Sequence, residues 1–514
     1  MKKIAETKNN TEKLTGYPHI DKPWMKYYDI ELLEKELPQM TAYEYQRIAN
    51  KDRGNLIAIR YYGKRINYSK FQENINRTAK GLTNIGVKED DRIAILMPVI
   101  PETAYIMYGV NKLGAVCDFI DPRPDSNDIE VNSKKLLDTL KKEKANYIIA
   151  INQVYDGLIK PIEEELKEIG INTVITVSAS ESLPFIIKQL FKIKELRKSN
   201  KKSIDKNKTL NVIKWGNFIK NGKDVEEKEC KYIKNKLALI VHTSGTTNAV
   251  PKPIPLTNDN MNTLVHQLFT AKVEYKPGVS VLQMLPYFAA YGSVNLAHFG
   301  FVSGAEMIQI PQFEVKDFGK ILVDNKAQHA MGMPSWYLAM IKDERIKNVD
   351  LSYLETAVCG GDKLTNEEEQ AINQFYKEHN SKCVVTKGIG MSEIGGCGTY
   401  AVNNYNDIGY LGIPLPNTTY MIVNPETKEP LNFENKEKIQ GLAYVSTPAM
   451  TSGKLDGNEI VPHMKIDGKD YINTRDIIEM NTDGKIKFVD RESRMFTRYD
   501  GYKIYPSNLE NIIK

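Results

Sequence analysis

A loop rich in hydroxyl and glycine residues is the part of this sequence whose residue types best suit phosphate binding. The apolar run 237–241 predicts a buried strand, the loop 243–247 follows it, and Lys252 comes shortly after. Small residues let backbone N–H groups approach phosphate oxygens, hydroxyl groups add donors or a metal ligand, and the lysine adds positive charge. Lys252 stands between Pro251 and Pro253, which disfavour the helix that a Walker A loop opens. We therefore predict a polyphosphate loop of a different kind.

Further segments follow the chain in an order that is typical of one group of enzymes. Together with the loop they resemble the motifs of the adenylate-forming superfamily, which contains acyl-CoA synthetases, peptide-synthetase adenylation domains and beetle luciferases. The resemblance extends from about Gly81 to Glu510. The resembling segments are Thr243 to Lys252 (T-S-G-T-T-G-x-P-K-G), Pro286 to Phe288 (beside the acyl pocket), Cys359 to Asp362 (the glycine pair beside adenine), Gly390 to Glu393 (Y-G-x-T-E), Thr474 to Asp476 (T-G-D) and Arg491 (the G-R before the hinge).

The resemblance implies a reaction, its cofactors and its partners. A carboxylate attacks the α-phosphorus of ATP to give an acyl-adenylate and pyrophosphate, and a thiol then displaces AMP. The implied acceptor is CoA, with the phosphopantetheine of an acyl-carrier protein as the alternative. Mg²⁺ is implied beside the phosphates, because a hard cation prefers hard oxygen ligands.

Each matched position carries an implied role. The residues expected to hold the phosphates are Thr243, Ser244, Gly245, Thr246, Thr247 and Lys252. The Mg²⁺ ligands are expected to be Thr246 and Glu393, and the catalytic residues Lys252, Glu393 and Thr246. Asp476 would accept hydrogen bonds from both ribose hydroxyls, and Arg491 would donate one to the ribose. The remaining nucleotide contacts are expected from Gly360, Gly361, Asp362, Ile389, Gly390, Met391 and Ser392.

Four positions depart from the family's pattern. Asn248 stands where the family has glycine, and Arg475 replaces the glycine of T-G-D. Ile389 stands where an aromatic ring stacks on adenine, which could forfeit about 0.5–1.5 kcal/mol. Ala289 occupies a position where many acyl-CoA synthetases carry histidine. These departures keep open a second hypothesis, a nucleotide- or acyl-binding protein with weak or no catalysis.

The segment beside the acyl pocket narrows the substrate class. Relatives that activate amino acids place an aspartate here to pair with the substrate ammonium, whereas residues 288–292 read Phe-Ala-Ala-Tyr-Gly. Burying an unpaired ammonium would be costly. We therefore expect an amine-free small-molecule carboxylic acid, such as a fatty or aryl acid.

Composition excludes several other classes of protein. With 41% hydrophobic and 26% charged residues among 514, the chain is globular rather than disordered or fibrous. A net charge of +5 does not provide the basic face of a nucleic-acid-binding protein. No apolar run approaches the ~20 residues of a membrane span, and no secretory signal is recognisable, so we expect a cytoplasmic protein. The five cysteines are scattered without CxxC pairs or histidines at ligand spacing, so neither a disulfide framework nor a zinc site is indicated, and we expect buried, reduced thiols.

The stretch 183–208 joins apolar residues to a lysine-dense tail. Such a pattern is typical of a solvated insertion, and the alternative is a basic amphipathic helix in weak contact with a membrane surface. The protein would then be peripheral to the membrane.

Alternating apolar runs and amphipathic segments predict an α/β fold. We expect two doubly wound, mostly parallel sheets with helices between them, plus a smaller β-rich subdomain. The clearest local signals are a capping box at Thr365 and a turn at 481–484 between two strands. The predicted units are a large domain over 1–489, divided into α/β units 50–235 and 236–405 and a β-rich unit 406–489, and a hinge with the start of a lid over 490–514.

The C-terminal residues resemble the beginning of a lid domain that in relatives has on the order of ~100 residues. Leu509, Ile512 and Ile513 begin an apolar stripe with nothing after it to pack against. We therefore expect Lys514 to be a truncation point and the chain to be impaired in the steps that need a lid.

Overall fold

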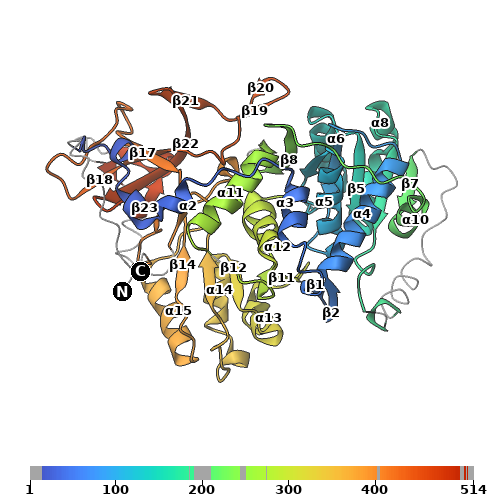
Figure 1. Cartoon of the computed structure of the whole chain (residues 1–514), viewed down its shortest axis with the longest axis horizontal. Coiled ribbons are helices and arrows are strands. Elements are labelled where there is room, and N and C mark those ends of the chain that lie inside the picture. The colour runs from blue at the N-terminus through green and yellow to red at the C-terminus, as the bar shows by residue number, and fades with distance from the viewer. Residues whose placement is uncertain are drawn as a thin grey trace.

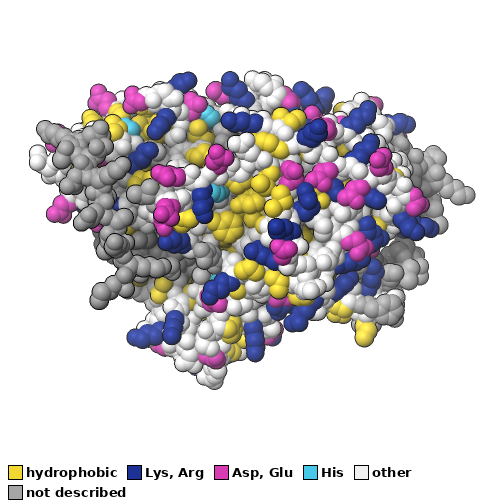
Figure 2. All heavy atoms as spheres, in the orientation of Figure 1, with side chains coloured by type: hydrophobic (Ala, Val, Ile, Leu, Met, Phe, Trp, Pro, Cys, Tyr) yellow, Lys and Arg dark blue, Asp and Glu magenta, His cyan; other side chains and the backbone are white. Residues whose placement is uncertain are grey.

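The computed structural model describes residues 14–124, 126–184, 186–189, 210–243, 251–273, 275–401, 406–497, 503–504 and 506. Two seven-stranded sheets lie side by side with helices between and around them, and a β-rich part sits at one end (Figure 1). This arrangement confirms the predicted α/β class. Positive and negative side chains are interspersed over the face in Figure 2, which presents no continuous basic surface.

The first sheet has the strand order β7-β6-β5-β3-β4-β8-β9. All neighbours are parallel except β8 and β9, which are antiparallel. Its central strands are buried on both faces, as strands covered by helices must be. The strand bounds are β3 Arg92–Leu96, β4 Val116–Phe119, β5 Tyr147–Ile151, β6 Thr173–Val177, β7 Asn211–Lys214, β8 Leu237–His242 and β9 Pro253–Thr257.

The second sheet has the strand order β14-β13-β12-β10-β11-β1-β2 and is parallel apart from the β1–β2 hairpin. Strands β1 and β2 precede every strand of the first sheet in sequence but belong to the second sheet, whereas β8 and β9, which follow residue 236, belong to the first. The predicted boundary at residue 236 therefore does not separate the two sheets. The bounds are β1 Ile57–Tyr61, β2 Lys64–Asn67, β10 Ser280–Gln283, β11 Glu306–Gln309, β12 His329–Gly332, β13 Thr356–Cys359 and β14 Val385–Lys387.

Helices between the two sheets join them into one core. The ring of Phe71 in α4 stacks on Phe301 in α12 at 4.7 Å and meets Tyr108 in α5 edge-on at 6.0 Å. Capping boxes at Thr41 and Thr257 begin α3 and α11, since each threonine oxygen accepts an otherwise unpaired backbone N–H. These helices are α3 Ala42–Ala49, α4 Tyr68–Asn84, α5 Pro101–Lys112, α11 Asn258–Thr270, η4 Tyr291–His298 and α12 Phe299–Ser303.

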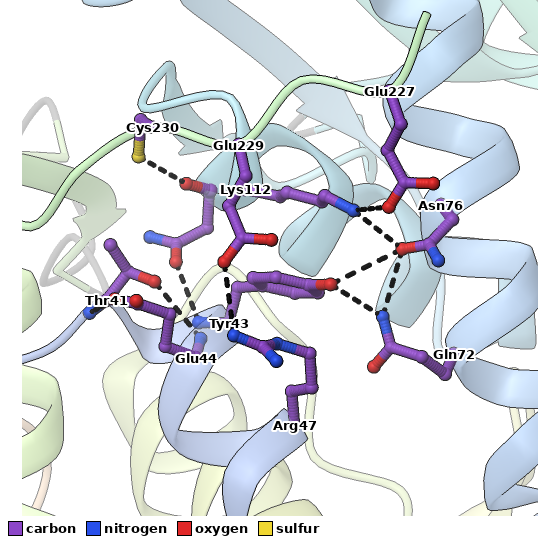
Figure 3. Close-up of polar contacts among 11 residues, drawn as sticks. Thr41, Tyr43, Glu44, Arg47, Gln72, Asn76, Lys112, Glu227, Glu229 and Cys230 are labelled. Carbon is purple, nitrogen blue, oxygen red and sulfur yellow. Dashed lines mark hydrogen bonds and ion pairs between the residues drawn. The ribbon is translucent and has the colours of Figure 1, made fainter.

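A buried lysine fixes the segment that leads into β8 (Figure 3). Lys112, whose side chain is 1% exposed, pairs with Glu227 and donates a 2.9 Å hydrogen bond to Asn76. Its ammonium lies 5.0 Å from the centre of the Tyr43 ring. Glu229, two residues after Glu227, forms an ion pair with Arg47 of α3 at 3.2 Å. The segment is thereby held against α3, α4 and α5, which positions the strand that carries the predicted phosphate loop.

The β-rich part contains a five-stranded antiparallel sheet, β17-β18-β22-β21 with β23 paired to β22. The predicted turn at 481–484 joins β22 to β23, and Gly484 there has φ +85°, which glycine adopts without strain. The bounds are β15 Thr399–Tyr400, β16 Ile413–Pro414, β17 Thr419–Val423, β18 Lys438–Ser446, β19 Lys454–Leu455, β20 Asn458–Glu459, β21 His463–Ile466, β22 Lys469–Asn481, β23 Ile486–Arg491, η9 Glu492–Arg494, β24 Phe496–Thr497 and β25 Lys503–Ile504.

The other helices surround these sheets. The capping box at Thr365 begins α15 as predicted. No helix in the described part of the chain is long and apolar enough to cross a membrane, and most of the stretch 183–208 lies outside the described residues. The bounds are α1 Pro18–Asp21, η1 Pro23–Tyr27, α2 Ile30–Leu33, α6 Ile129–Lys142, α7 Asn152–Val154, η2 Tyr155–Ile159, η3 Lys160–Ile162, α8 Glu163–Glu168, α10 Trp215–Asn221, η5 Val315–Asp317, α13 Phe318–Asn325, α14 Pro334–Met340, η6 Glu344–Ile346, α15 Asn366–Glu378 and η7 Ser392–Ile394.

Candidate functional site

The two ends of the predicted phosphate loop lie side by side. The backbone N–H of Thr243 donates to the carbonyl of Lys252 at 3.1 Å, and the N–H of Lys252 donates to Thr243 Oγ1 at 3.1 Å. These bonds extend the antiparallel pairing of β8 with β9 by one step. Ser244, Gly245, Thr246 and Thr247 lie outside the described residues. The base of the loop is therefore fixed by the first sheet.

Glu393 is brought to this base by a threonine that the sequence analysis missed. The N–H of Thr451 donates to the Glu393 carbonyl at 2.8 Å, and its hydroxyl donates to the carbonyl of Pro255 in β9 at 2.5 Å. Thr451 thus bridges η7 and β9. The sequence does contain a local signal for this contact. Residues 451–453 are rich in hydroxyl groups and glycine, and such runs commonly form hydrogen bonds between side-chain hydroxyls and backbone groups.

The charges of three cations act on the carboxyl group of Glu393. Burial raises the pKa of this carboxyl, and the positive charges of Lys252, Arg475 and Arg491 oppose that shift without cancelling it. Lys252 lies immediately before β9, and Arg475 and Arg491 lie in β22 and β23. The charges of the predicted lysine and arginine therefore act on the predicted glutamate, although the three residues are far apart in sequence, and Arg475 adds a third positive charge.

Asp476 and Arg491 face one another across neighbouring strands. They are directly paired in the register of β22 and β23, and Nη1 of Arg491 lies 2.8 Å from Oδ1 of Asp476, without the alignment of a hydrogen bond. The N–H of Asp476 donates to the hydroxyl of Thr474 at 3.1 Å, and that hydroxyl donates to a carbonyl of β18 at 2.8 Å. The Asp476 carboxylate is thus rigidly placed and retains capacity to accept hydrogen bonds.

Arg475 has a backbone conformation that explains why relatives carry glycine here. Its φ is +59°, in the left-handed region that costs an L-residue with a Cβ roughly 1–2 kcal/mol. The side chain of Asn473 accepts the Arg475 N–H at 2.7 Å and supports the turn. The departure from the family pattern therefore stores strain in the backbone and adds a positive charge beside Glu393.

Arg475→Gly is expected to raise the free energy of unfolding by up to about 1 kcal/mol, because glycine adopts this φ without strain but gains freedom in the unfolded chain. Urea denaturation measures the change. Arg475→Ala is the matched control, since it removes the charge and keeps the Cβ. An equal gain in both variants would mean that the charge, not the backbone, is responsible.

The glycine motifs pack around Tyr291. Gly361 follows β13 with φ +84°, and a Cβ on its neighbour Gly360 would lie 3.2 Å from the Tyr291 hydroxyl oxygen. A Cβ on Gly390 would lie only 2.1 Å from the carbonyl oxygen of Gly396, whose own Cβ would meet the backbone of Tyr291 at 2.9 Å. The two glycine-containing segments therefore approach each other through this tyrosine.

The other predicted nucleotide contacts occupy these same two segments. The N–H of Ile389 donates to Thr399 Oγ1 at 2.8 Å, and the Ile389 side chain is partly buried against the core. Met391 and Ser392 continue from Gly390 into η7. Asp362 is exposed and accepts the N–H of the next residue at 2.8 Å, which makes a turn.

The predicted acyl-pocket segment is anchored to the phosphate-loop strand. The N–H of His242, the last residue of β8, donates to the carbonyl of Phe288 at 2.9 Å. The guanidinium of Arg123 lies 5.1 Å from the centre of the Phe288 ring. The neighbouring Tyr287 is buried and packs on Phe119 with ring centres 5.5 Å apart. The phosphate-loop strand and the acyl segment therefore form one continuous structure.

Comparison with known proteins gives relatives that extend over almost the whole chain. A long-chain-fatty-acid–CoA ligase of Bacillus subtilis (strain 168) is 26% identical over 508 residues, which cover 96% of this chain and 84% of that protein. A probable 4-coumarate–CoA ligase 2 of Dictyostelium discoideum is 25% identical over 492 residues, which cover 95% and 82%.

A solved structure supports the fold independently. The crystal structure of a long-chain-fatty-acid-CoA ligase (FadD1) from Archaeoglobus fulgidus matches with a TM-score of 0.72 at 17% identity, covering 89% of this chain and 85% of that chain. At this identity the likeness establishes the fold alone. The model of the family described as "AMP-binding enzyme" matches residues 45–454, which include the loop and the glycine segments. The chain therefore belongs to the AMP-binding enzyme family of the adenylate-forming superfamily.

Proposed function

We propose that this protein uses ATP to activate a carboxylic acid as an acyl-adenylate and transfers the acyl group to CoA. The observation that carries the proposal is that four segments of the chain contribute interacting charges: Lys252 acts on Glu393, and Arg491 acts on Glu393 and pairs with Asp476. Family membership and the printed activities of the relatives, long-chain-fatty-acid–CoA ligase and 4-coumarate–CoA ligase, support it.

The residues that are present fit a magnesium nucleotide. The carboxyl of Asp476 is buried, and its contact with Arg491 is not aligned as a hydrogen bond, so it can accept from ribose hydroxyls. Glu393 offers carboxylate oxygens in a mostly buried position beside three cations, which suits a site shared by Mg²⁺ and phosphates. Thr246, the second proposed Mg²⁺ ligand, lies outside the described residues.

ATP supplies an electrophilic phosphorus and a pyrophosphate leaving group, and Mg²⁺ reduces the charge of the phosphates. The protein's own residues hold and polarise them. Lys252 and Arg475 place positive charge where the departing pyrophosphate gains negative charge, which lowers the barrier more than it stabilises the ground state. Asp476 and Arg491 would orient the ribose, and the segments that contain Gly360, Gly361 and Gly390 would lie beside the base.

The substrate is proposed to be an amine-free acid of the fatty or aryl class. Residues 286–292 carry no acidic side chain that could pair with a substrate ammonium. Arg123 lies over Phe288, and its charge is paired with Asp121 at 2.6 Å. The carrier-protein acceptor and the membrane-surface contact remain secondary proposals.

The test is ATP–pyrophosphate exchange with a panel of carboxylic acids, followed by thioester formation with CoA. Exchange that depends on fatty or aryl acids and not on amino acids is expected. Exchange with no acid in the panel, in a protein that still binds ATP, would favour the nucleotide-binding alternative. Exchange without thioester formation would favour an acceptor other than CoA, such as an acyl-carrier protein.

Asp476 makes nucleoside binding depend on pH. Burial raises the pKa of this carboxyl to about 6, against the lowering effect of Arg491. Only the ionised carboxylate accepts hydrogen bonds from both ribose hydroxyls, so affinity is complete above this pKa and falls as the pH drops through about 6. Adenosine is the appropriate ligand for calorimetry, because it has no phosphate that titrates in this range.

Asp476→Asn is the control for that experiment. It is expected to bind adenosine more weakly and without pH dependence near the pKa of the wild-type carboxyl. A pH profile that the variant retains unchanged would assign the titration to another group.

A further inference from the structure

Three buried side chains that the proposed reaction does not use meet beside the phosphate-loop strand. They are Asp118 in β4, Glu143 after α6 and His242 at the end of β8, and one ligand atom of each lies within 4.8 Å of the others. Their side chains are 0%, 2% and 7% exposed. Asp118 pairs with Ile240 in the parallel register, and His242 lies two residues further on, so both point to the same face of the sheet.

The histidine has the orientation of a metal ligand. Its Nδ1 lies 2.8 Å from the carbonyl oxygen of Phe119, which can only accept, so Nδ1 carries a proton. Nε2 therefore faces the carboxylates, 3.1 Å from each oxygen of Glu143 and 3.9 Å from Oδ1 of Asp118. Histidines that bind metals characteristically donate the other ring N–H to a carbonyl or carboxylate in this way.

The aspartate is the second indication of a ligand. Asp118 is fully buried, and apart from the neighbouring carboxyl group of Glu143 neither of its oxygens has a hydrogen-bond partner among the described residues. Two buried carboxyl groups side by side are costly without a positive charge between them. Arg92 and Lys144, which lie beside the cluster, both pair with Asp456 instead.

The charge of the cluster also suits a cation. Two carboxylates and a neutral imidazole carry a charge of −2, which a divalent cation would neutralise.

We propose that Asp118, Glu143 and His242 bind a divalent transition-metal cation of the Zn²⁺ class. Separations of 3.1–3.9 Å between Nε2 and the oxygens suit ligands that each lie about 2.0–2.2 Å from a central ion. A set of one imidazole and two carboxylates favours Zn²⁺ over Mg²⁺, which prefers oxygen ligands alone. The ion ties β4, the end of α6 and β8 together immediately before Thr243.

The experiment uses the full chain, stripped with a chelator and free of nucleotide, so that no magnesium–nucleotide complex forms. Zn²⁺ is added, and the metal retained after gel filtration is measured together with the melting temperature. We expect one Zn²⁺ per chain, release of protons and a higher melting temperature. Co²⁺ is expected to give visible absorption bands without the charge-transfer bands of thiolate ligands.

The variants separate this site from other ligands in the chain. Asp118→Asn and His242→Gln are each expected to weaken Zn²⁺ binding by at least about 10–100-fold. Glu393→Gln and Cys230→Ser should retain it, because the first alters the proposed nucleotide site and the second removes the cysteine that is not fully buried. Equal retention of Zn²⁺ by all four variants and the wild type would overturn the proposal.

A measurement on the wild-type protein covers the case in which Asp118→Asn fails to fold. Zn²⁺ is expected to shift the Nε2 resonance of His242 in ¹⁵N-histidine spectra towards that of a metal-bound nitrogen. A resonance that stays at the imidazolium position in the presence of Zn²⁺ would overturn the proposal. The cluster would then be a buried imidazolium held by two carboxylates.

Discussion

Glu393→Gln and Lys252→Ala are each expected to lower adenylate formation about 10²–10³-fold, the loss typical of removing one group that stabilises charge in a transition state. Glu393 is mostly buried among Lys252, Arg475 and Arg491, so its neutral isostere removes a Mg²⁺ ligand without changing the shape of the site. Lys252→Ala removes positive charge near the departing pyrophosphate. The measurement is ATP–pyrophosphate exchange at saturating acid.

Matched surface variants control for general effects of charge. Glu344 and Lys347 are 82% and 68% exposed and pair only weakly, so Glu344→Gln and Lys347→Ala should leave exchange unchanged. Exchange at the wild-type rate in Glu393→Gln or Lys252→Ala would refute the role given to that residue. Unchanged melting temperatures would separate a loss of chemistry from a loss of folding.

Lys387→Met is expected to destabilise the protein by about 3–5 kcal/mol, because it leaves a buried carboxylate without its partner. Lys387 in β14 pairs with Glu369 in α15, and their side chains are 4% and 0% exposed. Burial lowers the pKa of Lys387, and the hydrogen bond and charge of Glu369 oppose that shift. Glu369 also accepts the N–H of Gly409 at 2.9 Å, so the pair joins three segments just before Ile389.

Lys320→Met provides the comparison, because Lys320 and Asp324 form an exposed pair on a helix with side chains 48% and 55% exposed. Its cost is expected to stay within about 0.5 kcal/mol. Both variants are measured by urea denaturation. A cost for Lys387→Met as small as that of the surface variant would mean that Glu369 takes up a proton or water without penalty.

Local patterns determined much of this protein. The apolar run 237–241 predicted a buried strand, which is β8, because both faces of a strand in a helix-covered sheet must be apolar. The capping box at Thr365 and the turn at 481–484 predicted the start of α15 and the β22–β23 hairpin, since each satisfies its hydrogen bonds within a few residues. The ordered motifs identified the superfamily.

The order of the strands and the contacts between distant segments determined the features that the sequence did not predict. No spacing in the sequence relates Asp118, Glu143 and His242, and they meet because β5-β3-β4-β8 are neighbours in one sheet. In the sequence, Arg475 was only a departure from the family's glycine. In the structure, its backbone is left-handed and its positive charge acts on Glu393. Which strands become neighbours depends on the packing of whole sheets and helices, because only the complete core compensates the chain entropy lost in closing such long loops.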